Sequence, residues 1–572
     1  MALRLGDILI EKRLITAQEL ELALKEQERT NEVLGRVLLK MGLIKEAALL
    51  QAIAEQQGIA FLELRDLEIH DKAIRSVPVK FIWHYNILPL SIAGNILTIA
   101  VSNPFDVWPI DDLETNLGFH VEKALATSSD IAEAIKKYYG VGADTIERIL
   151  TQSPSGGRPE EKASGDKVED LERMAEDASV VRLVNQIVQR AINDRATDIH
   201  IERFSDELLL RSRIDGILYD TPVSQNVKHL YSAIISRVKV MASLDIIERR
   251  LPQDGRAKVK IGNLDYDLRI SIMPTLYGEN IVIRILPTTM LFSVADLGMS
   301  KKELETLEDL LKRPNGIIFV TGPTGSGKTT TLYASLSRLN TRERKIVTIE
   351  DPIEYELRGI SQVQVNPRIG LTFAAVLRSL LRHDPDIMMV GEVRDFETAE
   401  ITIQTALTGH LVFSTLHTND AASGITRLID MGVEPFLISS SVEAFIAQRL
   451  VRLICPKCKE EANDQKEEII RQMEADMADL SGKDHPKEFR IYKGRGCRSC
   501  NNTGYVGRTG IYEALLVTEE IKKLILTKAY SDVIKKKALQ LGMKTLRQNG
   551  WEKVLAGVTT FEEVVRVTQA EE

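Results

Sequence analysis

Residues 316–329 read Gly-Ile-Ile-Phe-Val-Thr-Gly-Pro-Thr-Gly-Ser-Gly-Lys-Thr, a short apolar run that leads directly into the pattern GxxxxGK[ST]. The apolar run predicts a buried strand, and a helix-compatible segment follows at 332–339. A strand, a glycine-rich loop and a helix form the context that a phosphate-binding P-loop requires, which disfavours a chance match in a glycine-rich loop. The sequence therefore predicts an ATP-binding α/β domain.

Each residue type in this loop has a role in holding phosphate. Glycines let the backbone turn so that successive N–H groups point at the anion, where side chains would block the approach. Lys328 would place its ammonium against the β- and γ-phosphates, Thr329 would offer its hydroxyl to Mg²⁺, and from Thr330 on a helix would face the anion with its positive end. The predicted nucleotide-binding residues are Gly322, Pro323, Thr324, Gly325, Ser326, Gly327, Lys328, Thr329 and Thr330.

Two further apolar segments end in carboxylates. One ends at Glu350, and the other runs through Gly391 to Glu392. Catalytic groups collect at the carboxyl edge of an open α/β sheet, so Glu350 is a candidate general base or water orienter. Glu392 could act on Mg²⁺ through water, because Mg²⁺ keeps several waters and needs few protein carboxylates. The alternative is that both only cap strands, and the sequence leaves open which of the two is the base.

A third apolar strand lies within residues 408–420 and is flanked by His410 and His417. A histidine beside a strand is often a structural hydrogen-bonding group. The end of this strand is nevertheless expected beside the phosphate site, so His417 could sense the γ-phosphate. Both interpretations stay open.

All four cysteines of the chain lie in two CxxC pairs, Cys455 with Cys458 and Cys497 with Cys500. Tetrahedral Zn²⁺ takes four thiolates delivered by two tight turns, so the spacing predicts a closed, structural zinc site. The zinc would pin the insertion 455–500, whose charged spacer 460–487 is predicted to be helical. A redox-active disulfide pair is the alternative.

The amino-terminal residues contain an internal repeat. The run Leu5-Gly6, followed by Leu14, recurs 29 residues later as Leu34-Gly35, followed by Leu43. Each unit predicts two amphipathic helices, which together form a helical subdomain at 1–58. A small α/β unit is predicted at 59–145. The polar composition that follows it predicts a flexible linker at 146–178.

Four motifs carry a resemblance that covers nearly the whole chain. GPTGSGKTT, TIEDPIE, DPDIMMVGEVRD and TGHLVFSTLHTNDA, in this order, resemble the Walker A, Asp box, Walker B and His box of the ATPases that drive type II secretion and type IV pili. The closer resemblance is to the pilus assembly (extension) ATPases, with the type II secretion ATPases or a nucleotide-gated scaffold as alternatives. It implies an α/β multidomain protein with a RecA-like core at 289–572, working as an ATP-hydrolysing homohexamer. In this family Gly391-Glu392 is the normal Walker B ending, and extension-type members commonly carry the cysteine cluster.

The resemblance also implies a mixed α/β, PAS-like domain at 179–288 that presents arginines to the nucleotide. Strand-like alternation in this region agrees with that expectation. Arg269 and Arg284 are the candidates for reaching the γ-phosphate, with Arg211 and Arg213 as secondary ones. Such an arginine can raise the rate on the order of 10³-fold, whereas a surface ion pair is the alternative role.

The amino-terminal repeat is similar to the tandem motif of the MshEN-like domain that binds cyclic di-GMP in related ATPases. Two positions depart from that motif, because Arg13 stands where it has glycine and Val33 stands where the first unit has Arg4. Loss of one arginine could weaken the binding of this ligand by roughly 1.5–3 kcal/mol. Whether cyclic di-GMP binds is left open. In the family, the region at 59–145 docks on the inner-membrane platform protein and its cytoplasmic adaptor.

Composition fits a globular chain of several domains: 572 residues, 44% hydrophobic and 27% charged, with a net charge of −8. The acidic balance argues against nonspecific nucleic-acid binding. No apolar run approaches the ~20 residues of a membrane helix, and the first residues lack the apolar core of a secretory signal. We therefore expect a cytoplasmic protein at the inner-membrane face of an assembly machinery, with membrane association only through partners.

Overall fold

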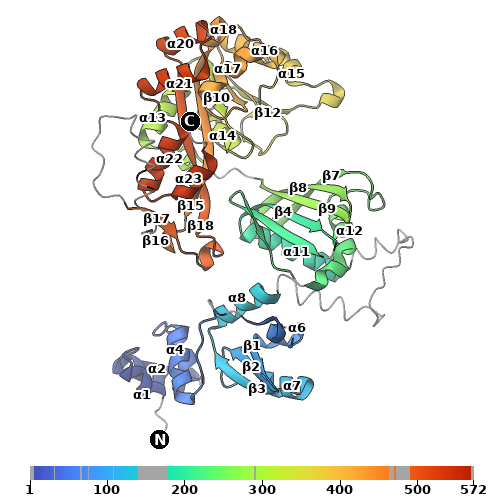
Figure 1. Cartoon of the computed structure of the whole chain (residues 1–572), viewed down its shortest axis with the longest axis vertical. Coiled ribbons are helices and arrows are strands. Elements are labelled where there is room, and N and C mark those ends of the chain that lie inside the picture. The colour runs from blue at the N-terminus through green and yellow to red at the C-terminus, as the bar shows by residue number, and fades with distance from the viewer. Residues whose placement is uncertain are drawn as a thin grey trace. The chain divides into compact units, whose positions relative to one another are not determined.

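The computed structural model describes residues 5–139, 177–288, 292–462 and 490–568, apart from eight positions within these ranges: 31, 65, 66, 68, 75, 107, 206 and 224. Residues 469 and 471 are also described. The chain divides into two compact units, one of residues 1–259 and 268–285, the other of residues 260–267 and 286–572 (Figure 1). Most of the predicted linker at 146–178, and Arg4 of the repeat, lie outside the described residues. None of the helices in the described part is long and apolar enough to cross a membrane.

The amino-terminal repeat forms two helix pairs, as its pattern predicts. Its helices are α1 (Leu5–Glu11), α2 (Ala17–Thr30), α3 (Leu34–Lys40) and α4 (Glu46–Gln57). Gly6 lies against Leu20, where an added Cβ would come within 2.9 Å of the leucine side chain, and Gly35 lies against Leu49 in the same way at 3.2 Å. The same glycine therefore permits the same close helix contact in both units.

The turn between the helices of each unit uses the left-handed backbone region. Arg13 has φ +54° and Gly42, 29 residues later, has φ +70°. Glycine adopts this region without steric cost, whereas other residues are disfavoured there by roughly 1–2 kcal/mol. The fold thus tolerates the departure from the glycine motif at Arg13 at a local cost.

We expect the variant G42A to weaken local protection of α3 and α4 by about 1 kcal/mol, because alanine meets the left-handed strain that glycine avoids. R13G should leave α1 and α2 unchanged or slightly better protected, since relief of strain offsets the added freedom of the unfolded chain. Amide hydrogen exchange of residues 5–57 in the full chain measures both. Equal loss of protection in both variants would contradict this account of the turn.

The predicted α/β unit follows, and it shares its core with the helical repeat. Strands β1 (Leu88–Ala93) and β2 (Ile96–Val101) pair antiparallel, and β2 pairs in parallel with β3 (His120–Leu125). One hydrophobic cluster runs from the first helix to the last helix of this region. The helices of the α/β unit are α5 (Asp71–Ile74), α6 (Val79–Tyr85), α7 (Trp108–Leu117) and α8 (Ser128–Tyr139).

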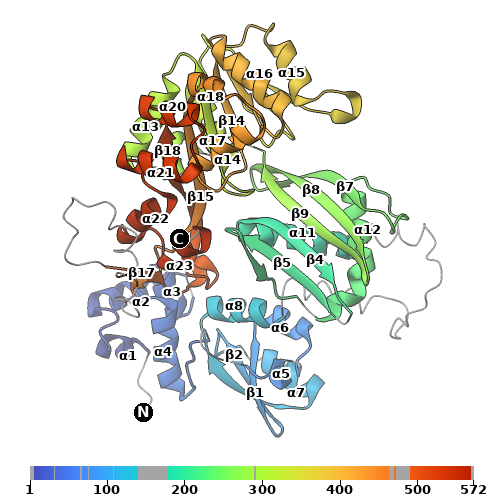
Figure 2. The ribbon, with the colours of Figure 1, turned by 45° about the horizontal axis from the view of Figure 1, so that its top comes forward.

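The arginine-bearing domain is a six-stranded sheet with helices packed on one face (Figure 2). The strand order is β6-β5-β4-β9-β8-β7. In β8, Leu268, Ile270 and Ile272 are buried while the alternate residues face away, which confirms the period-2 pattern. The elements are α11 (Ala178–Asn193), β4 (Ala196–Arg203), β5 (Leu208–Ile214), β6 (Ile217–Asp220), η1 (Gln225–Leu230), α12 (Tyr231–Met241), β7 (Gln253–Ile261), β8 (Leu264–Thr275) and β9 (Gly278–Pro287).

The carboxy-terminal core is a seven-stranded sheet in the order β12-β11-β13-β14-β10-β15-β18. All neighbouring strands pair in parallel except β15 and β18. The P-loop strand β10 thus lies between β14 and β15, and β13, which leads to Glu392, is one strand further. The strands are β10 (Gly316–Thr321), β11 (Ile346–Glu350), β12 (Ser361–Gln364), β13 (Ile387–Val390), β14 (Leu411–Leu416), β15 (Val442–Ile454) and β18 (Tyr505–Leu516). This order confirms the predicted RecA-like core.

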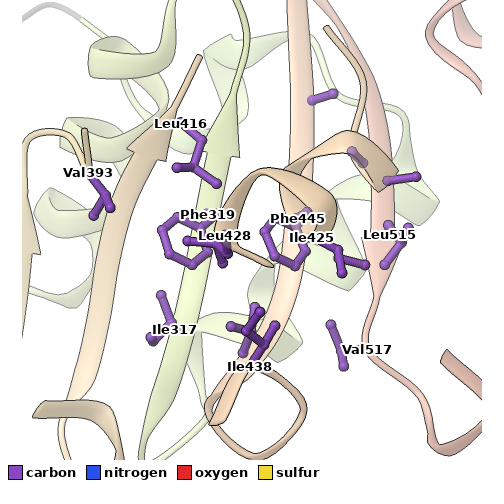
Figure 3. Packing of buried hydrophobic residues seen from close by; sticks show 14 of the residues in the cluster. Ile317, Phe319, Val393, Leu416, Ile425, Leu428, Ile438, Phe445, Leu515 and Val517 are labelled. Carbon is purple, nitrogen blue, oxygen red and sulfur yellow. The ribbon is translucent and has the colours of Figure 1, made fainter. Parts of the chain in front are cut away.

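Both faces of this sheet are buried, which explains the continuous apolar runs in the sequence. Along β10, Ile317 and Phe319 belong to one hydrophobic cluster, and Ile318 and Val320 belong to the cluster on the opposite face. Figure 3 shows the first cluster, where the ring of Phe319 stacks on Phe445 with centroids 5.3 Å apart. The helices are α13 (Lys301–Leu311), α14 (Lys328–Leu339), α15 (Phe373–Leu380), α16 (Phe396–Leu407), α17 (Ala422–Asp430), α18 (Pro435–Ser441), α20 (Glu519–Leu526), α21 (Ser531–Gln540), α22 (Leu546–Leu555) and α23 (Phe561–Val567).

Candidate nucleotide and metal sites

The P-loop connects β10 to α14 and has the backbone that phosphate binding requires. Gly322, Gly325 and Gly327 have φ values of +147°, +80° and +89°. A Cβ on Gly322 would lie 2.6 Å from Ser326 Oγ, and a Cβ on Gly327 would lie 2.8 Å from Gln448 Nε2. Only glycine fits these two positions, so the loop is shaped to bring backbone rather than side chains to an anion.

Lys328 begins α14 and folds back over the loop. Its Nζ donates to the carbonyl oxygens of Gly322 at 2.8 Å and Pro323 at 3.0 Å. Burial lowers the pKa of Lys328 to about 8, with Glu392 acting in the opposite direction and Arg449 adding to the decrease. A neighbouring carboxylate and a neighbouring guanidinium therefore both act on the P-loop lysine.

The carboxylate of Glu392 lies at the carboxyl end of β13 and is only 13% exposed. One of its oxygens is 2.6 Å from Arg394 Nη2 and the other is 3.2 Å from His417 Nε2. The hydroxyl of Thr415 donates to the Gly391 carbonyl at 2.7 Å, which fixes the backbone just before Glu392. The structure thus brings two of the predicted residues, Glu392 and His417, together beside the P-loop lysine.

Glu350 occupies a different setting at the end of β11, where it is 3% exposed. It accepts hydrogen bonds from the hydroxyls of Tyr333 and Thr348 and from Gln362 Nε2, the last at 3.1 Å. Burial, together with the adjacent Glu350, raises the pKa of Tyr333, so this hydroxyl stays a donor. Because Tyr333 belongs to α14, Glu350 ties the helix of the P-loop to β11, the next strand along the chain.

The predicted arginines lie on the outer face of the six-stranded sheet. Arg269 and Arg284 line a cavity of about 410 Å³, together with Arg256, which the sequence reasoning did not single out. Arg284 Nε donates to Asp198 at 3.0 Å. The secondary candidates do not line this cavity; Arg211 pairs with Glu202, and Arg213 Nε is 3.8 Å from Asp198.

The four cysteines form one cluster at the far end of β15. Their sulfur atoms all lie within 4.8 Å of one another, with separations of 3.7 Å for Cys455 and Cys497 and 3.9 Å for Cys458 and Cys500. Tetrahedral Zn–S bonds of about 2.3 Å place sulfur atoms about 3.8 Å apart, so the cluster fits zinc. All four cysteines are free, and a disulfide needs sulfurs at about 2.05 Å, which disfavours the redox alternative.

The cysteine cluster is built on a tight hairpin. Strands β16 (Lys459–Glu461) and β17 (Tyr492–Gly494) pair antiparallel between the two CxxC turns. The backbone N–H groups of Cys497 and Gly504 donate to Cys500 Sγ at 3.1 and 3.3 Å, so the second CxxC turn closes on this sulfur. The start of the spacer is therefore strand rather than the predicted helix, because it pairs with the returning chain. Apart from two residues, 463–489 lie outside the described part.

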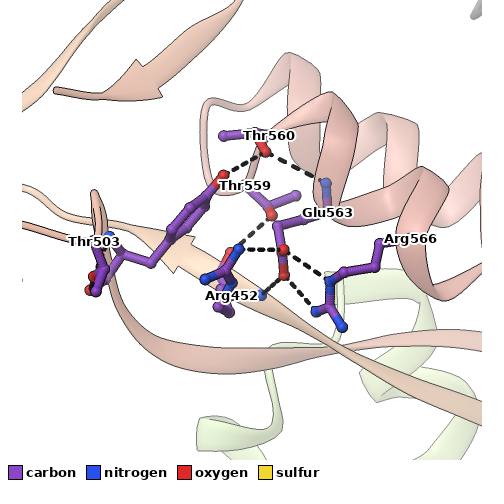
Figure 4. A network of polar contacts seen from close by, with 7 residues as sticks. Arg452, Thr503, Thr559, Thr560, Glu563 and Arg566 are labelled. Atoms are coloured by element: carbon purple, nitrogen blue, oxygen red, sulfur yellow. Dashed lines mark hydrogen bonds and ion pairs between the residues drawn. The ribbon is translucent and has the colours of Figure 1, made fainter. Parts of the chain in front are cut away.

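Polar contacts fasten the end of β15 near the cysteine cluster to α23 (Figure 4). Arg452 Nη2 and Arg566 Nη2 each lie 2.7 Å from a carboxylate oxygen of Glu563. Burial alone would raise the pKa of Glu563, but the two arginines lower it to about 2. Arg452 also lies 3.9 Å above the ring of Tyr505. The strand that leads into the cysteine cluster is thus fastened to α23 of the core.

Residues 173–566 match the model of the family described as type II/IV secretion system protein. The chain belongs to this family. Residues 57–145 match the model of the MshEN domain. These matches confirm the family that the four ordered motifs predict, and with it a secretion ATPase. They do not test the individual site residues or the domain limits, which stay predictions.

Two relatives are similar to this chain over nearly its whole length. The type IV pilus assembly ATPase PilB of Myxococcus xanthus is 42% identical over 99% of both chains. The type II secretion system protein E of Xanthomonas campestris is 40% identical over 99% of this chain and 98% of its own. Among solved structures, the Legionella pneumophila ATPase DotB covers 67% of this chain and 94% of its own at 21% identity and a TM-score of 0.49.

Two residues of this secretion-family core were missed by sequence reasoning. Gln448 and Arg449 lie on β15, outside every motif, yet Gln448 Oε1 accepts from Thr331 at 2.7 Å and Arg449 acts on the pKa of Lys328. Only the parallel pairing of β15 with β10 places them beside the P-loop. A sequence pattern does not specify which strand becomes that neighbour.

Proposed function

We propose that this chain is the motor ATPase that drives type IV pilus assembly, acting as a homohexamer at the cytoplasmic face of the inner membrane. The observation that carries the proposal is the 42% identity over 99% of both chains with the Myxococcus xanthus pilus assembly ATPase. The cluster of Lys328, Glu392 and His417 supports it, because it combines a phosphate-binding lysine with a carboxylate held in place. The partners would be the inner-membrane platform protein and its cytoplasmic adaptor.

In this proposal the P-loop amides and Lys328 bind the triphosphate, and the Glu392 carboxylate orients the attacking water. His417 holds that carboxylate in position through its Nε2. Thr329, in the first turn of α14, and Glu392 through water would hold Mg²⁺, which neutralises charge on the phosphates when bound. Glu350 keeps α14 in register with β11 through Tyr333, which is a positioning role rather than that of a base.

Arg269 and Arg284 are proposed to stabilise the charge that develops on the transferred phosphoryl group. Three arginines and one aspartate, Asp254, line this concave cavity, so basic residues outnumber acidic ones there and the cavity suits an anion. Asp198 holds Arg284 by its Nε, leaving the terminal nitrogens of the guanidinium as donors that could be aimed at a phosphate. Zinc at the four cysteines is proposed as a structural ion.

Cyclic di-GMP is proposed as a ligand of the amino-terminal module. The support is the match to the MshEN domain and the preceding helical repeat, in which both helix pairs form and Arg13 adopts the backbone conformation that Gly42 has in the second unit. Calorimetric titration of the full chain with cyclic di-GMP tests this part of the proposal independently of turnover.

Pseudopilus-driven protein export by a type II secretion system is the alternative, favoured by the 40% identity with the Xanthomonas campestris protein E. Deletion of the gene should abolish surface pili while leaving export of secreted enzymes intact, as scored by electron microscopy and by enzyme activity in the medium. Loss of the exported enzyme with pili retained would assign the alternative.

Complementation of the deletion distinguishes a motor from a nucleotide-gated scaffold. The E392Q variant should fail to restore pili, because it removes the carboxylate that orients water. The E397Q variant is the control: it changes an exposed glutamate in α16, five residues later, and should restore pili. Full restoration of pili by E392Q would mean that output does not need hydrolysis, as expected of a scaffold.

A further inference from the structure

Strand β15 is longer than the P-loop strand β10 beside it, so β15 runs on past the end of β10. The parallel register pairs Thr321, the last residue of β10, with Ala447, while β15 continues to Ile454. The next two residues of β15, Gln448 and Arg449, therefore lie alongside the P-loop itself.

These two residues point to opposite faces of the strand, as successive strand residues do. Gln448 is 2% exposed and faces α14, where it accepts from the hydroxyl of Thr331. Arg449 faces the other way; its Nη2 donates to the Asn419 carbonyl at 2.9 Å and its Nη1 donates to the Gln448 carbonyl at 3.1 Å. Nη1 would also lie 3.2 Å from a Cβ built on Gly322.

The residue that Arg449 holds belongs to the loop that carries the predicted histidine. We call residues 417–420 the His-box loop. His417, at its start, lies 3.2 Å from Glu392, and Asn419 follows two residues later. Arg449 thus hydrogen-bonds to the His-box loop at Asn419, while its Nη1 lies beside Gly322, the first residue of the P-loop.

The guanidinium of Arg449 bonds to neutral oxygens, as expected of a group that holds backbone segments together. Among the described residues, no carboxylate lies within ion-pair distance of its guanidinium. Burial lowers the pKa of Arg449, and the more distant carboxylates of Glu513 and Asp420 only partly oppose this. Its hydrogen bonds go to backbone carbonyls and to the Asn419 amide oxygen. A planar guanidinium can make these contacts at once, whereas a lysine ammonium cannot span the same carbonyls.

We propose that Arg449 is a positioning residue for ATP hydrolysis, which holds the His-box loop at Asn419 against Gly322 of the P-loop and so fixes where His417 holds the Glu392 carboxylate. This inference rests on the proposed hydrolytic function. It assigns to β15 a part in aligning the site that none of the four motifs contains.

Steady-state ATP hydrolysis and the affinity for a fluorescent ADP analogue, both on the full chain, test the proposal. R449A should lower kcat about 10-fold or more while the affinity for the ADP analogue stays within about 3-fold, because misplacement by about 1 Å can cost 10²-fold in rate and the P-loop amides remain. R449K should be intermediate. R338A, which removes an exposed arginine from the same P-loop helix, should match the wild type.

A kcat of R449A within about 2-fold of the wild type would overturn the proposal, as would an R449A or R449K chain whose nucleotide affinity falls in parallel with kcat. If R449A does not fold, R449K decides by the same two measurements. Hydrogen exchange of residues 417–420 separates this inference from the proposed function. Faster exchange in R449A supports the link even if the wild type shows no turnover, and unchanged exchange overturns it.

Discussion

Replacing Glu392 by glutamine should lower the turnover of ATP by about 10²–10⁴-fold, the usual contribution of a positioned acid or base. The amide keeps the size and one acceptor oxygen of the side chain but loses the negative charge that orients and activates water. Arg394 and His417, which contact the two carboxylate oxygens, would remain beside it. Nucleotide affinity should change little, because the P-loop amides and Lys328 bind the phosphates.

Single-turnover hydrolysis at saturating ATP, together with equilibrium binding of an ADP analogue, separates the loss of chemistry from the loss of binding. E397Q is the matched control. Glu397, in α16, is also a glutamate that pairs with an arginine, Arg378, but it is exposed. An E392Q chain that kept more than a tenth of wild-type turnover would transfer the role to another carboxylate, of which Glu350 is the candidate from the sequence.

The contrast between Glu350 and Glu392 shows what a motif predicts and what it cannot. Both follow short apolar strands, and this pattern correctly predicts that both end at the carboxyl edge of the sheet. Their different settings depend on neighbours from other parts of the chain, Tyr333 and Gln362 for Glu350, and His417 for Glu392. Hydrogen-bond partners that are distant in sequence leave no local signal, so the choice between the two carboxylates needs the structure.

The same reasoning applies to the arginines and to the amino-terminal module. Alternation along β8 predicts the face on which Arg269 lies, but the pairing of Arg284 with Asp198 depends on the register of β4 with β9.

The helical repeat and the α/β unit are predicted as separate subdomains because their sequence periodicities differ. Their apolar faces nevertheless bury each other in one core. Sequence periodicity identifies which face of an element is buried, and the partner of that face is a property of the tertiary fold.

Loss of zinc should unfold the cysteine clamp, which we define as residues 455–462 and 490–504, while leaving the nucleotide core folded. Structural zinc contributes roughly 10–16 kcal/mol of apparent binding free energy in small zinc modules, far more than this short hairpin could gain from its own contacts. Strands β16 and β17 make only three residue pairs. Without the metal, repulsion between thiolates or burial of four thiols would replace four Zn–S bonds, and the two CxxC turns would lose their common anchor.

The double variant C455S/C458S removes two ligands, and K457S changes an exposed residue of the same turn that is not a ligand. We expect one zinc per chain in the wild type and in K457S, none in the double variant, and faster hydrogen exchange in the double variant at 455–462 and 490–504 alone. The core should resist, because β15 continues beyond β10 in its pairing with β18, and Arg452 holds its end to Glu563 of α23. Unchanged exchange in a zinc-free chain would show that the hairpin stands without the metal. Exchange that also rises in α14 would show instead that zinc supports the nucleotide site through β15, which leads into Cys455 and whose Gln448 contacts Thr331 of α14.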